Sequence, residues 1–83
     1  MFTVYILKSE SIDRYYVGYT NDLERRLTEH NRKKGKYTDI GIPWKLVHSE
    51  IYASKKEAME REKFIKQQKS RDFIESLVSS SAG

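Results

Sequence analysis

The chain has 83 residues, with 16 basic and 12 acidic side chains and a net charge of +4. This length leaves room for one domain with a small core, in which each inward-facing polar side chain is a noticeable cost. The absence of cysteine excludes disulfides, thiolate metal sites and cysteine nucleophiles, and it fits a reducing compartment. The positive net charge favours a polyanionic partner, although a merely basic surface explains the charge equally well.

The N-terminal segment lacks a basic start followed by a long apolar stretch, so we expect no signal peptide. None of the apolar runs in the sequence approaches the roughly 20 residues that a membrane span requires. We therefore expect a soluble, cytoplasmic protein that has no membrane partner.

Three segments predict β-strands. Residues 2–8 carry apolar side chains on both alternating faces, which is typical of a central strand. Residues 15–20 are aromatic and β-branched, and the short polar link between these two segments favours an antiparallel hairpin. Residues 44–52 predict a third strand, with Trp44, Leu46 and His48 on one face.

Capping signals predict three helices. Asn21 is expected to cap a helix that runs to residue 34, before a polar loop that contains two glycines and the only proline. Ser54 opens a capping box for a second helix that ends near Gln68. Ser70 is expected to cap a third helix, whose apolar side chains recur at helical spacing.

These elements predict an α+β fold, in which helices flank a small three-stranded antiparallel sheet in the order β-β-α-β-α-α. No internal repeat or long linker interrupts the sequence. We expect a single domain at residues 1–79, followed by a disordered tail at residues 80–83.

Two polar residues share the apolar stripe of the first predicted helix. Leu23 and Leu27 mark this stripe, and Arg26 and His30 fall on it at helical spacing. A guanidinium and an imidazole that face inward cost stability unless they have partners. The alternative is that both side chains lie at the edge of the stripe and reach into water.

A carboxylate takes the corresponding place on the second predicted helix. Glu62 lies on the same face as Ala58 and Ile65. Spacing alone leaves open whether this carboxylate has a function, lies at a solvated edge, or pairs with Arg61 or Lys66.

The second strand is rich in tyrosine and contains a glycine. Tyr15, Tyr16 and Tyr19 are joined by Tyr5 on the neighbouring strand, and a core of amphipathic rings is the simpler explanation. Gly18 indicates a bulge or the close approach of a ligand to the backbone. Together with the arginine, histidine and glutamate, these residues suit phosphodiester cleavage, which needs a base, a counter-charge and a metal.

Four ordered segments resemble motifs of the GIY-YIG nuclease superfamily. They are Val4-Tyr5-Ile6, in which valine replaces the leading glycine, Tyr16-Val17-Gly18, the helix with its arginine and histidine four residues apart, and the segment 60–66 around the glutamate. The resemblance covers roughly residues 2–78. It is greatest to small stand-alone bacterial members, which are related to the N-terminal nuclease module of the UvrC repair protein.

The resemblance implies a role for each site residue. Glu62 would hold one divalent metal, Mg²⁺ or Mn²⁺, and Arg26 would clamp the scissile phosphate. Tyr16 would act as the general base or position the water. Tyr5 would support the site through hydrogen bonding, and His30 would position or relay a proton.

The implied function is a GIY-YIG-type endonuclease, a phosphodiester hydrolase of low intrinsic sequence specificity. The resemblance favours DNA over RNA and a role in DNA repair or recombination. Two basic clusters are expected to contact phosphates, with a solvated face as the alternative for each: Arg32, Lys33, Lys34 and Lys36, and Lys63, Lys66, Lys69 and Arg71.

Two other functions stay open at this point. The chain could be a non-catalytic nucleic-acid-binding module, or an interaction module that a larger repair partner recruits. The sequence also leaves open whether the protein forms a homodimer.

Overall fold

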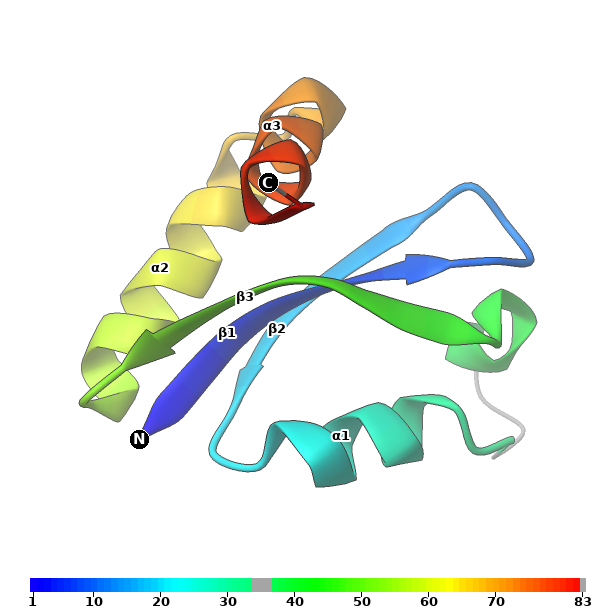
Figure 1. The fold of residues 1–83 in the computed structure, drawn as a ribbon, viewed down its shortest axis with the longest axis horizontal. Coiled ribbons are helices and arrows are strands. Elements are labelled where there is room, and N and C mark those ends of the chain that lie inside the picture. The colour runs from blue at the N-terminus through cyan, green and yellow to red at the C-terminus, as the bar shows by residue number, and fades with distance from the viewer. Residues whose placement is uncertain (34–36, 83) are drawn as a thin grey trace.

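The computed structural model describes residues 1–33 and 37–82. The predicted α+β class and the order β-β-α-β-α-α are confirmed (Figure 1). A short 3-10 helix at Tyr37–Gly41 precedes the third strand. The other elements are β1 (Phe2–Ser9), β2 (Tyr15–Thr20), α1 (Leu23–His30), β3 (Trp44–Tyr52), α2 (Lys55–Gln67) and α3 (Arg71–Ala82).

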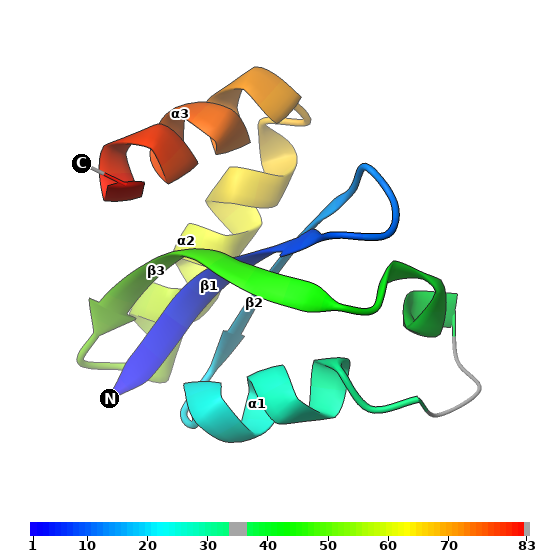
Figure 2. The ribbon, with the colours of Figure 1, turned by 45° about the vertical axis from the view of Figure 1, so that its right-hand side comes forward.

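The three strands form one antiparallel sheet in the order β2-β1-β3. The central position of β1 explains why its sequence is apolar on both faces, because both faces are covered. Four consecutive residues of β1 are at most 2% exposed: Val4, Tyr5, Ile6 and Leu7. Figure 2 shows α1 on one side of the sheet and α3 on the other.

The sheet separates two small cores. On the side of α2 and α3 the core is aliphatic, with the buried residues Val4, Ile6, Val17, Ala58 and Ile65. On the side of α1 it is largely aromatic, with buried Tyr5, Leu7 and Trp44 and half-buried Tyr16, Leu23 and Leu27 packed against them. Of the tyrosines that the sequence analysis identified, Tyr5 and Tyr16 belong to the aromatic core, whereas Tyr15 and Tyr19 pack against the aliphatic core.

A bulge in β3 overturns one predicted face. Ile6 pairs with His48 whereas Leu7 pairs with Leu46, so Val47 is the extra residue. Directly paired residues share a face of the sheet, and Ile6 and Leu7 face opposite cores. The prediction that His48 lies on the same face as Leu46 is therefore wrong, because a bulge reverses the alternation.

The first helix begins one residue later than predicted. Its N-cap is Asp22, whose carboxylate accepts a hydrogen bond from the Arg25 backbone N–H at 3.1 Å. The Asp22 N–H in turn donates to the Thr20 hydroxyl at 3.1 Å, which closes a turn after β2. The prediction of Asn21 as the cap is wrong, because this turn places the acidic neighbour at the helix terminus, where its charge is favourable.

The same helix ends at His30 and not at residue 34. The next residue, Asn31, binds both backbone groups of Trp44. The Trp44 N–H donates to Asn31 Oδ1 at 2.6 Å, and Asn31 Nδ2 donates to the Trp44 carbonyl at 3.0 Å. This long-range contact replaces a further helical turn and ties α1 to the start of β3.

The predicted caps of the other two helices are confirmed. Ser54 Oγ accepts a hydrogen bond from the Glu57 N–H at 3.2 Å, and its hydroxyl donates to the Glu57 carboxylate at 2.9 Å. Ser70 Oγ accepts from the Phe73 N–H at 3.1 Å. Both caps are made within a few residues of chain, which is why the sequence shows them.

The third helix continues past residue 79 to Ala82. The domain limits of 1–79 and the disorder of residues 80–83 stay predictions. In the described part of the chain, no helix has both the length and the apolar content needed to cross a membrane.

Candidate active site

A polar hollow of about 480 Å³ opens beside β2, where α1 and α2 flank the edge of the sheet. It brings together four of the five predicted catalytic residues: Tyr5, Tyr16, Arg26 and Glu62. They come from β1, β2, α1 and α2, so the hollow is the place where these four elements converge.

The fifth residue, His30, contacts this group from the last turn of α1. Its Nε2 lies 3.3 Å from the hydroxyl oxygen of Tyr5. Its ring meets the Tyr16 ring edge to face, with centroids 4.5 Å apart. His30 therefore lies behind the two tyrosines and holds them, while they face the hollow.

Tyr5 lies on the central strand β1, and its side chain is buried. Burial raises the pKa of its hydroxyl well above the ordinary value, and the neighbouring Tyr16 adds to the effect. Tyr5 therefore stays protonated over the whole neutral range. This suits the supporting role that the sequence analysis expects of Tyr5.

Gly18 is needed because the Tyr5 ring crosses directly over it. The two residues are cross-strand partners, and a Cβ at Gly18 would lie 2.6 Å from the Tyr5 hydroxyl oxygen and 3.1 Å from the Tyr16 ring. The register between β1 and β2 runs on through this pair. The predicted bulge is therefore wrong, and the Tyr5 side chain fills the space over Gly18. The predicted approach of a ligand to this backbone stays a prediction, since Gly18 also lines the hollow.

Tyr16 is held by the rings around it. Its ring stacks on Tyr5 at 6.3 Å with an interplanar angle of 22°, and Trp44 meets it edge to face at 6.3 Å. With His30 on a third side, little rotational freedom remains for the Tyr16 side chain. The phenol of Tyr16 is therefore fixed at the wall of the hollow.

Arg26 reaches the hollow from the exposed side of α1. Its side chain is 49% exposed, while Leu23 and Leu27 beside it are half-buried, so Arg26 lies at the edge of the apolar stripe. Its Nε is 3.8 Å from the Glu29 carboxylate. An exposed pair at that distance contributes little, so the guanidinium can turn to an incoming anion.

Glu62 enters the hollow from α2, at the edge of the stripe formed by buried Ala58 and Ile65. Its side chain is 21% exposed, and Lys66 Nζ lies 3.7 Å from the carboxylate. Lys55 lines the same hollow, and the sequence analysis missed it. The signal was present, because Lys55 precedes Glu62 by seven residues and so shares its helical face.

The donor set of the hollow fits a hard, hydrated cation. Glu62 is the only carboxylate among the residues that line it. Within residues 1–33 and 37–82, no three histidine or acidic side chains gather into a metal cage. Mg²⁺ keeps most of its waters and commonly uses one or two carboxylates plus substrate phosphates, so Glu62 suits a metal that binds together with phosphate.

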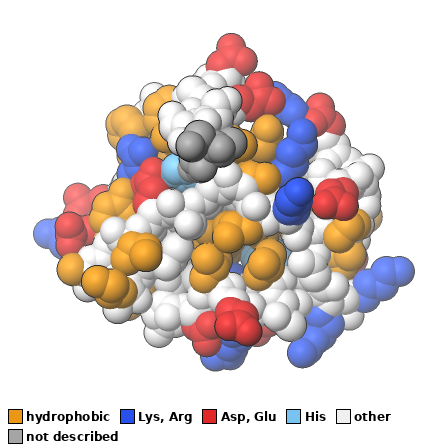
Figure 3. All heavy atoms as spheres, viewed as in Figure 1, with side chains coloured by type: hydrophobic (Ala, Val, Ile, Leu, Met, Phe, Trp, Pro, Cys, Tyr) orange, Lys and Arg blue, Asp and Glu red, His pale blue; other side chains and the backbone are white. Residues whose placement is uncertain are grey.

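Two of the predicted phosphate-contacting lysines, Lys66 and Lys69, lie near β2. Lys63, Lys66 and Lys69 are exposed, and Lys66 and Lys69 line a second hollow that also includes Tyr16. In the other cluster, Arg32 and Lys33 are exposed after α1, while Lys34 and Lys36 lie outside the described residues. On the face shown in Figure 3, acidic and basic side chains are interspersed.

The guanidinium of Arg71 binds partners within the fold. Its guanidinium contacts the Asp13 carboxylate at 2.5 Å and the Glu75 carboxylate at 3.2 Å. It also lies over the Tyr15 ring at 5.1 Å. These contacts join α3 to the β1–β2 hairpin and leave Arg71 less suited to phosphate binding than the neighbouring lysines.

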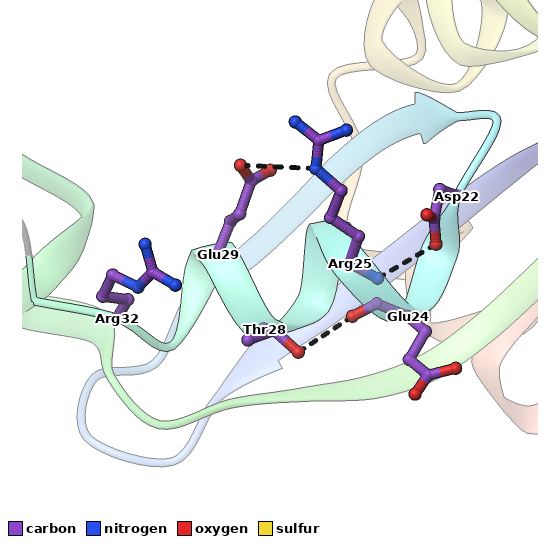
Figure 4. A pocket seen from close by; sticks show the side chains of 6 residues that line it. All are labelled: Asp22, Glu24, Arg25, Thr28, Glu29 and Arg32. Carbon is purple, nitrogen blue, oxygen red and sulfur yellow. Dashed lines mark hydrogen bonds and ion pairs between the residues drawn. The ribbon is translucent and has the colours of Figure 1, made fainter.

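Another hollow lies on the outer face of α1, with a volume of about 510 Å³ (Figure 4). Its groups serve the helix itself, since Asp22 caps it and the Thr28 hydroxyl donates to the Glu24 carbonyl at 3.0 Å. Its charged side chains are of both signs, as the lining residues show: Asp22, Glu24, Arg25, Thr28, Glu29 and Arg32. It contains none of the five predicted catalytic residues and is not the candidate site.

The three-stranded sheet, with Tyr5, Tyr16, Arg26 and Glu62 converging at one edge, is the arrangement that the resemblance to GIY-YIG domains predicts. Residues 1–75 match the model of the GIY-YIG catalytic domain, and the chain belongs to the GIY-YIG family. The resemblance drawn from the sequence is thereby confirmed. Membership in this family suggests nuclease activity and nucleic-acid binding.

The relatives of the chain are small UPF0213 proteins. It is 48% identical to one from Halobacterium salinarum over 68 residues, covering 81% of this chain and 87% of the relative. A Streptococcus pneumoniae relative is 50% identical over 56 residues, which span 66% of this chain but only 57% of that protein. The solution NMR structure of a Bacillus halodurans UPF0213 protein matches with a TM-score of 0.62 and 34% identity, covering 100% of this chain and 88% of the other.

Proposed function

We propose that the protein is a metal-dependent nuclease that hydrolyses phosphodiester bonds in nucleic acid. One observation carries the proposal. Tyr16, Arg26 and Glu62 come from a strand and two helices separated in the sequence, yet their side chains line one polar hollow. A catalytic constellation of this kind is built from residues that the fold brings together.

In this proposal each side chain has one task. Arg26 binds the scissile phosphate and stabilises the charge that develops on its oxygens. Tyr16 positions the attacking water or, as the phenolate, takes its proton, while Tyr5 and His30 keep Tyr16 in place. Glu62 holds Mg²⁺ or Mn²⁺, which when bound supplies positive charge beside a phosphate oxygen.

The substrate is proposed to be DNA, cut with little sequence preference. The lysines around the hollow suit contacts with the phosphate backbone, which fix position but carry no sequence information. A cytoplasmic role in DNA repair or recombination follows from the resemblance to the UvrC nuclease module and belongs to the same proposal.

A non-catalytic phosphate-binding module is the second candidate. The Glu62 carboxylate lies 3.7 Å from Lys66, and Lys55 lines the same hollow. Two lysines beside one carboxylate favour a phosphate that binds without metal. This function would appear as metal-independent binding with no turnover.

The test is cleavage of labelled single-stranded, duplex and branched DNA, and of RNA, with Mg²⁺ or Mn²⁺ and with EDTA. Arg26→Ala and Glu62→Gln should each lower the rate by about 10²–10³-fold, since each removes a charge used in the transition state. Arg25→Ala is the matched control, because Arg25 also pairs with Glu29 but points away from the hollow.

Metal-dependent cleavage that fails in Arg26→Ala and Glu62→Gln, and persists in Arg25→Ala, would support the proposal. Absence of cleavage on every substrate, with salt-sensitive binding intact, would replace it with the binding-module function.

A further inference from the structure

A second polar cluster joins α2 to β3 outside the candidate active site. Its centre is the Glu50 carboxylate. Arg61 approaches as a fork, with Nε 2.9 Å from Oε1 and Nη2 3.2 Å from Oε2. The Tyr52 hydroxyl donates to Oε1 at 2.6 Å, and His48 Nε2 lies 2.8 Å from Oε2.

These groups are mostly shielded from water. The side chains of His48, Glu50 and Arg61 are 9%, 19% and 28% exposed. Burial alone would raise the Glu50 pKa, but hydrogen bonds from Arg61, Tyr52 and His48 outweigh it and lower the pKa to about 2. The Glu50–Arg61 pair is therefore a permanent ionic link between the strand and the helix at neutral pH.

Arg61 is the residue directly before Glu62 on α2. Neighbouring residues of an α-helix project about 100° apart, at 3.6 residues per turn. Ala58 and Ile65 mark the side of α2 that packs on the sheet. Arg61 contacts β3 on one flank of that side, and Glu62 enters the hollow at β2 on the other.

The apolar residues of α2 do not by themselves fix how the helix is rolled about its axis. Ala58 and Ile65 are buried, yet Met59 and Phe64 are each 45% exposed. Phe64 contacts Phe73 of α3 edge to face, with ring centroids 5.9 Å apart, and apolar contacts are non-directional. A directional contact is needed to select the observed roll.

We infer that the Glu50–Arg61 pair sets the roll of α2 and thereby holds the Glu62 carboxylate in the hollow with Tyr16 and Arg26. Glu50 and Arg61 are then positioning residues for the reaction, an assignment that rests on the proposed function of Glu62. Buried ion pairs contribute little net stability compared with apolar replacements, and selection of one register is their best-attested use.

A small rotation of α2 about its axis is enough to displace the Glu62 carboxylate and lower the rate of cleavage. At the outer radius of a helix, about 5–6 Å, a roll of about 20° moves a side-chain end by about 2 Å. Misplacement of a catalytic group by about 1 Å lowers a rate by about 100-fold.

The test separates positioning from stability. The double variant Glu50→Met/Arg61→Met removes the pair, leaves the net charge unchanged and replaces it with apolar side chains that keep the helix packed. Lys56→Met/Glu60→Met is the matched control, since it removes one base and one acid from the exposed face of α2. Arg61→Lys keeps the charge but loses the fork, and it gives a second variant if the double one unfolds.

Three quantities are measured in the full chain: the unfolding midpoint, Mn²⁺ binding through the broadening of amide NMR signals around Glu62, and kcat and KM for cleavage. We expect a folded double variant in which Mn²⁺ affinity falls by about 10-fold or more and kcat by about 10–100-fold, with KM little changed. The control double variant should match the wild type. Wild-type Mn²⁺ affinity and kcat in a folded double variant would overturn the inference, because the pair would then be structural only.

The inference and the proposed function can fail separately. If the wild type neither cleaves nucleic acid nor binds Mn²⁺, the proposed function fails. The roll of α2 is then judged from nuclear Overhauser contacts of the Ala58 methyl group with Val4 and Val17, its partners in the core. Contacts that change in the double variant support the role of the pair, and unchanged contacts overturn it.

Discussion

Gly18 and Tyr5 share a space that holds only one side chain. A methyl group at Gly18 would lie 2.6 Å from the Tyr5 hydroxyl oxygen and 2.8 Å from Cζ. We expect Gly18→Ala to lower the free energy of unfolding by about 1–3 kcal/mol, because overpacking forces a buried ring to move. Denaturant unfolding measures the change, and cleavage should fall as well, since the displaced ring would move Tyr16.

The control for this substitution is Ser49→Ala, on the other strand that pairs with Tyr5. Ser49 is exposed, so its loss should change the free energy of unfolding by less than about 0.5 kcal/mol. A Gly18→Ala protein as stable as this control would show that the Tyr5 ring can move without cost.

The lowered pKa of Glu50 predicts that the free energy of unfolding decreases in acid. Its pKa falls from 4.5 in the unfolded chain to about 2 in the fold. The ionised carboxylate therefore stabilises the fold fully above pH 4.5, and this contribution is lost as the pH falls toward 2. The shift corresponds to about 3 kcal/mol.

Urea unfolding of the wild type and of Glu50→Gln at pH 7 and pH 3 checks this prediction. The wild type should lose more stability on acidification than the variant, which has no carboxyl group to protonate at that position. An equal loss in both proteins would show that other carboxyl groups cause the acid sensitivity.

At the residue scale, the sequence predicted which residues come together at the candidate site, but not the polar contacts around Glu50 beside it. Helical spacing marked Arg26 and Glu62 as polar residues on apolar faces, and the resemblance to the GIY-YIG family assigned both of them and Tyr16 to the site. The fold places all three in one hollow. Their assigned roles stay predictions. The cluster around Glu50 could not be predicted, because the bulge that turns His48 toward it leaves no mark in the alternation of the strand.

At the scale of elements, the side chain of Asn31 links the end of α1 to the start of β3 through two hydrogen bonds with the Trp44 backbone. Removing its side chain would leave the partly buried N–H and C=O of Trp44 without their partner in Asn31. We expect Asn31→Ala to lower the free energy of unfolding by about 1–3 kcal/mol. Amide hydrogen exchange in α1 should also accelerate, since this helix packs on the sheet through few contacts and none of its described residues is buried.

Asn21→Ala is the comparison for this helix. Asn21 has the same side chain but is not the cap, so the variant should keep the free energy of unfolding within about 0.5 kcal/mol of the wild type. If Asn21→Ala were as destabilised as Asn31→Ala, the assignment of Asp22 and not Asn21 as the cap would be wrong.

Helix boundaries set by local hydrogen bonds could be predicted from the sequence, whereas a boundary set by a long-range contact could not. Ser54 and Ser70 cap α2 and α3 through bonds to residues three positions ahead, and both caps were predicted correctly. The end of α1 depends on a contact between Asn31 and Trp44, thirteen residues apart. A helix boundary set by such a contact cannot be read from local propensity.

At the scale of the whole molecule, the described basic residues include some at the candidate site and others with partners inside the fold. Lys55 lines the hollow, whereas Arg71 is engaged with Asp13, Glu75 and the Tyr15 ring. We expect Lys55→Gln to weaken nucleic-acid binding and to reduce the slope of log affinity against log salt by about 0.7–0.9, the value of one phosphate contact. Arg71→Gln should lower the unfolding temperature and leave that slope unchanged.

Fluorescence anisotropy titrations over a series of salt concentrations give the slopes, and thermal unfolding gives the stabilities. A reduced slope in Arg71→Gln would show that Arg71 leaves its internal partners to bind phosphate. An unchanged slope in Lys55→Gln would exclude a phosphate contact at Lys55.

The aromatic core beneath the site has an optical consequence. Trp44 is the only tryptophan of the chain, and its buried indole lies 6.3 Å from the Tyr16 ring. At that separation, light absorbed by Tyr16 can pass to the indole, so a ligand that moves the Tyr16 ring should change the emission of Trp44. The protein therefore carries a built-in reporter at the wall of its candidate site, through which ligand binding can be followed in unlabelled material.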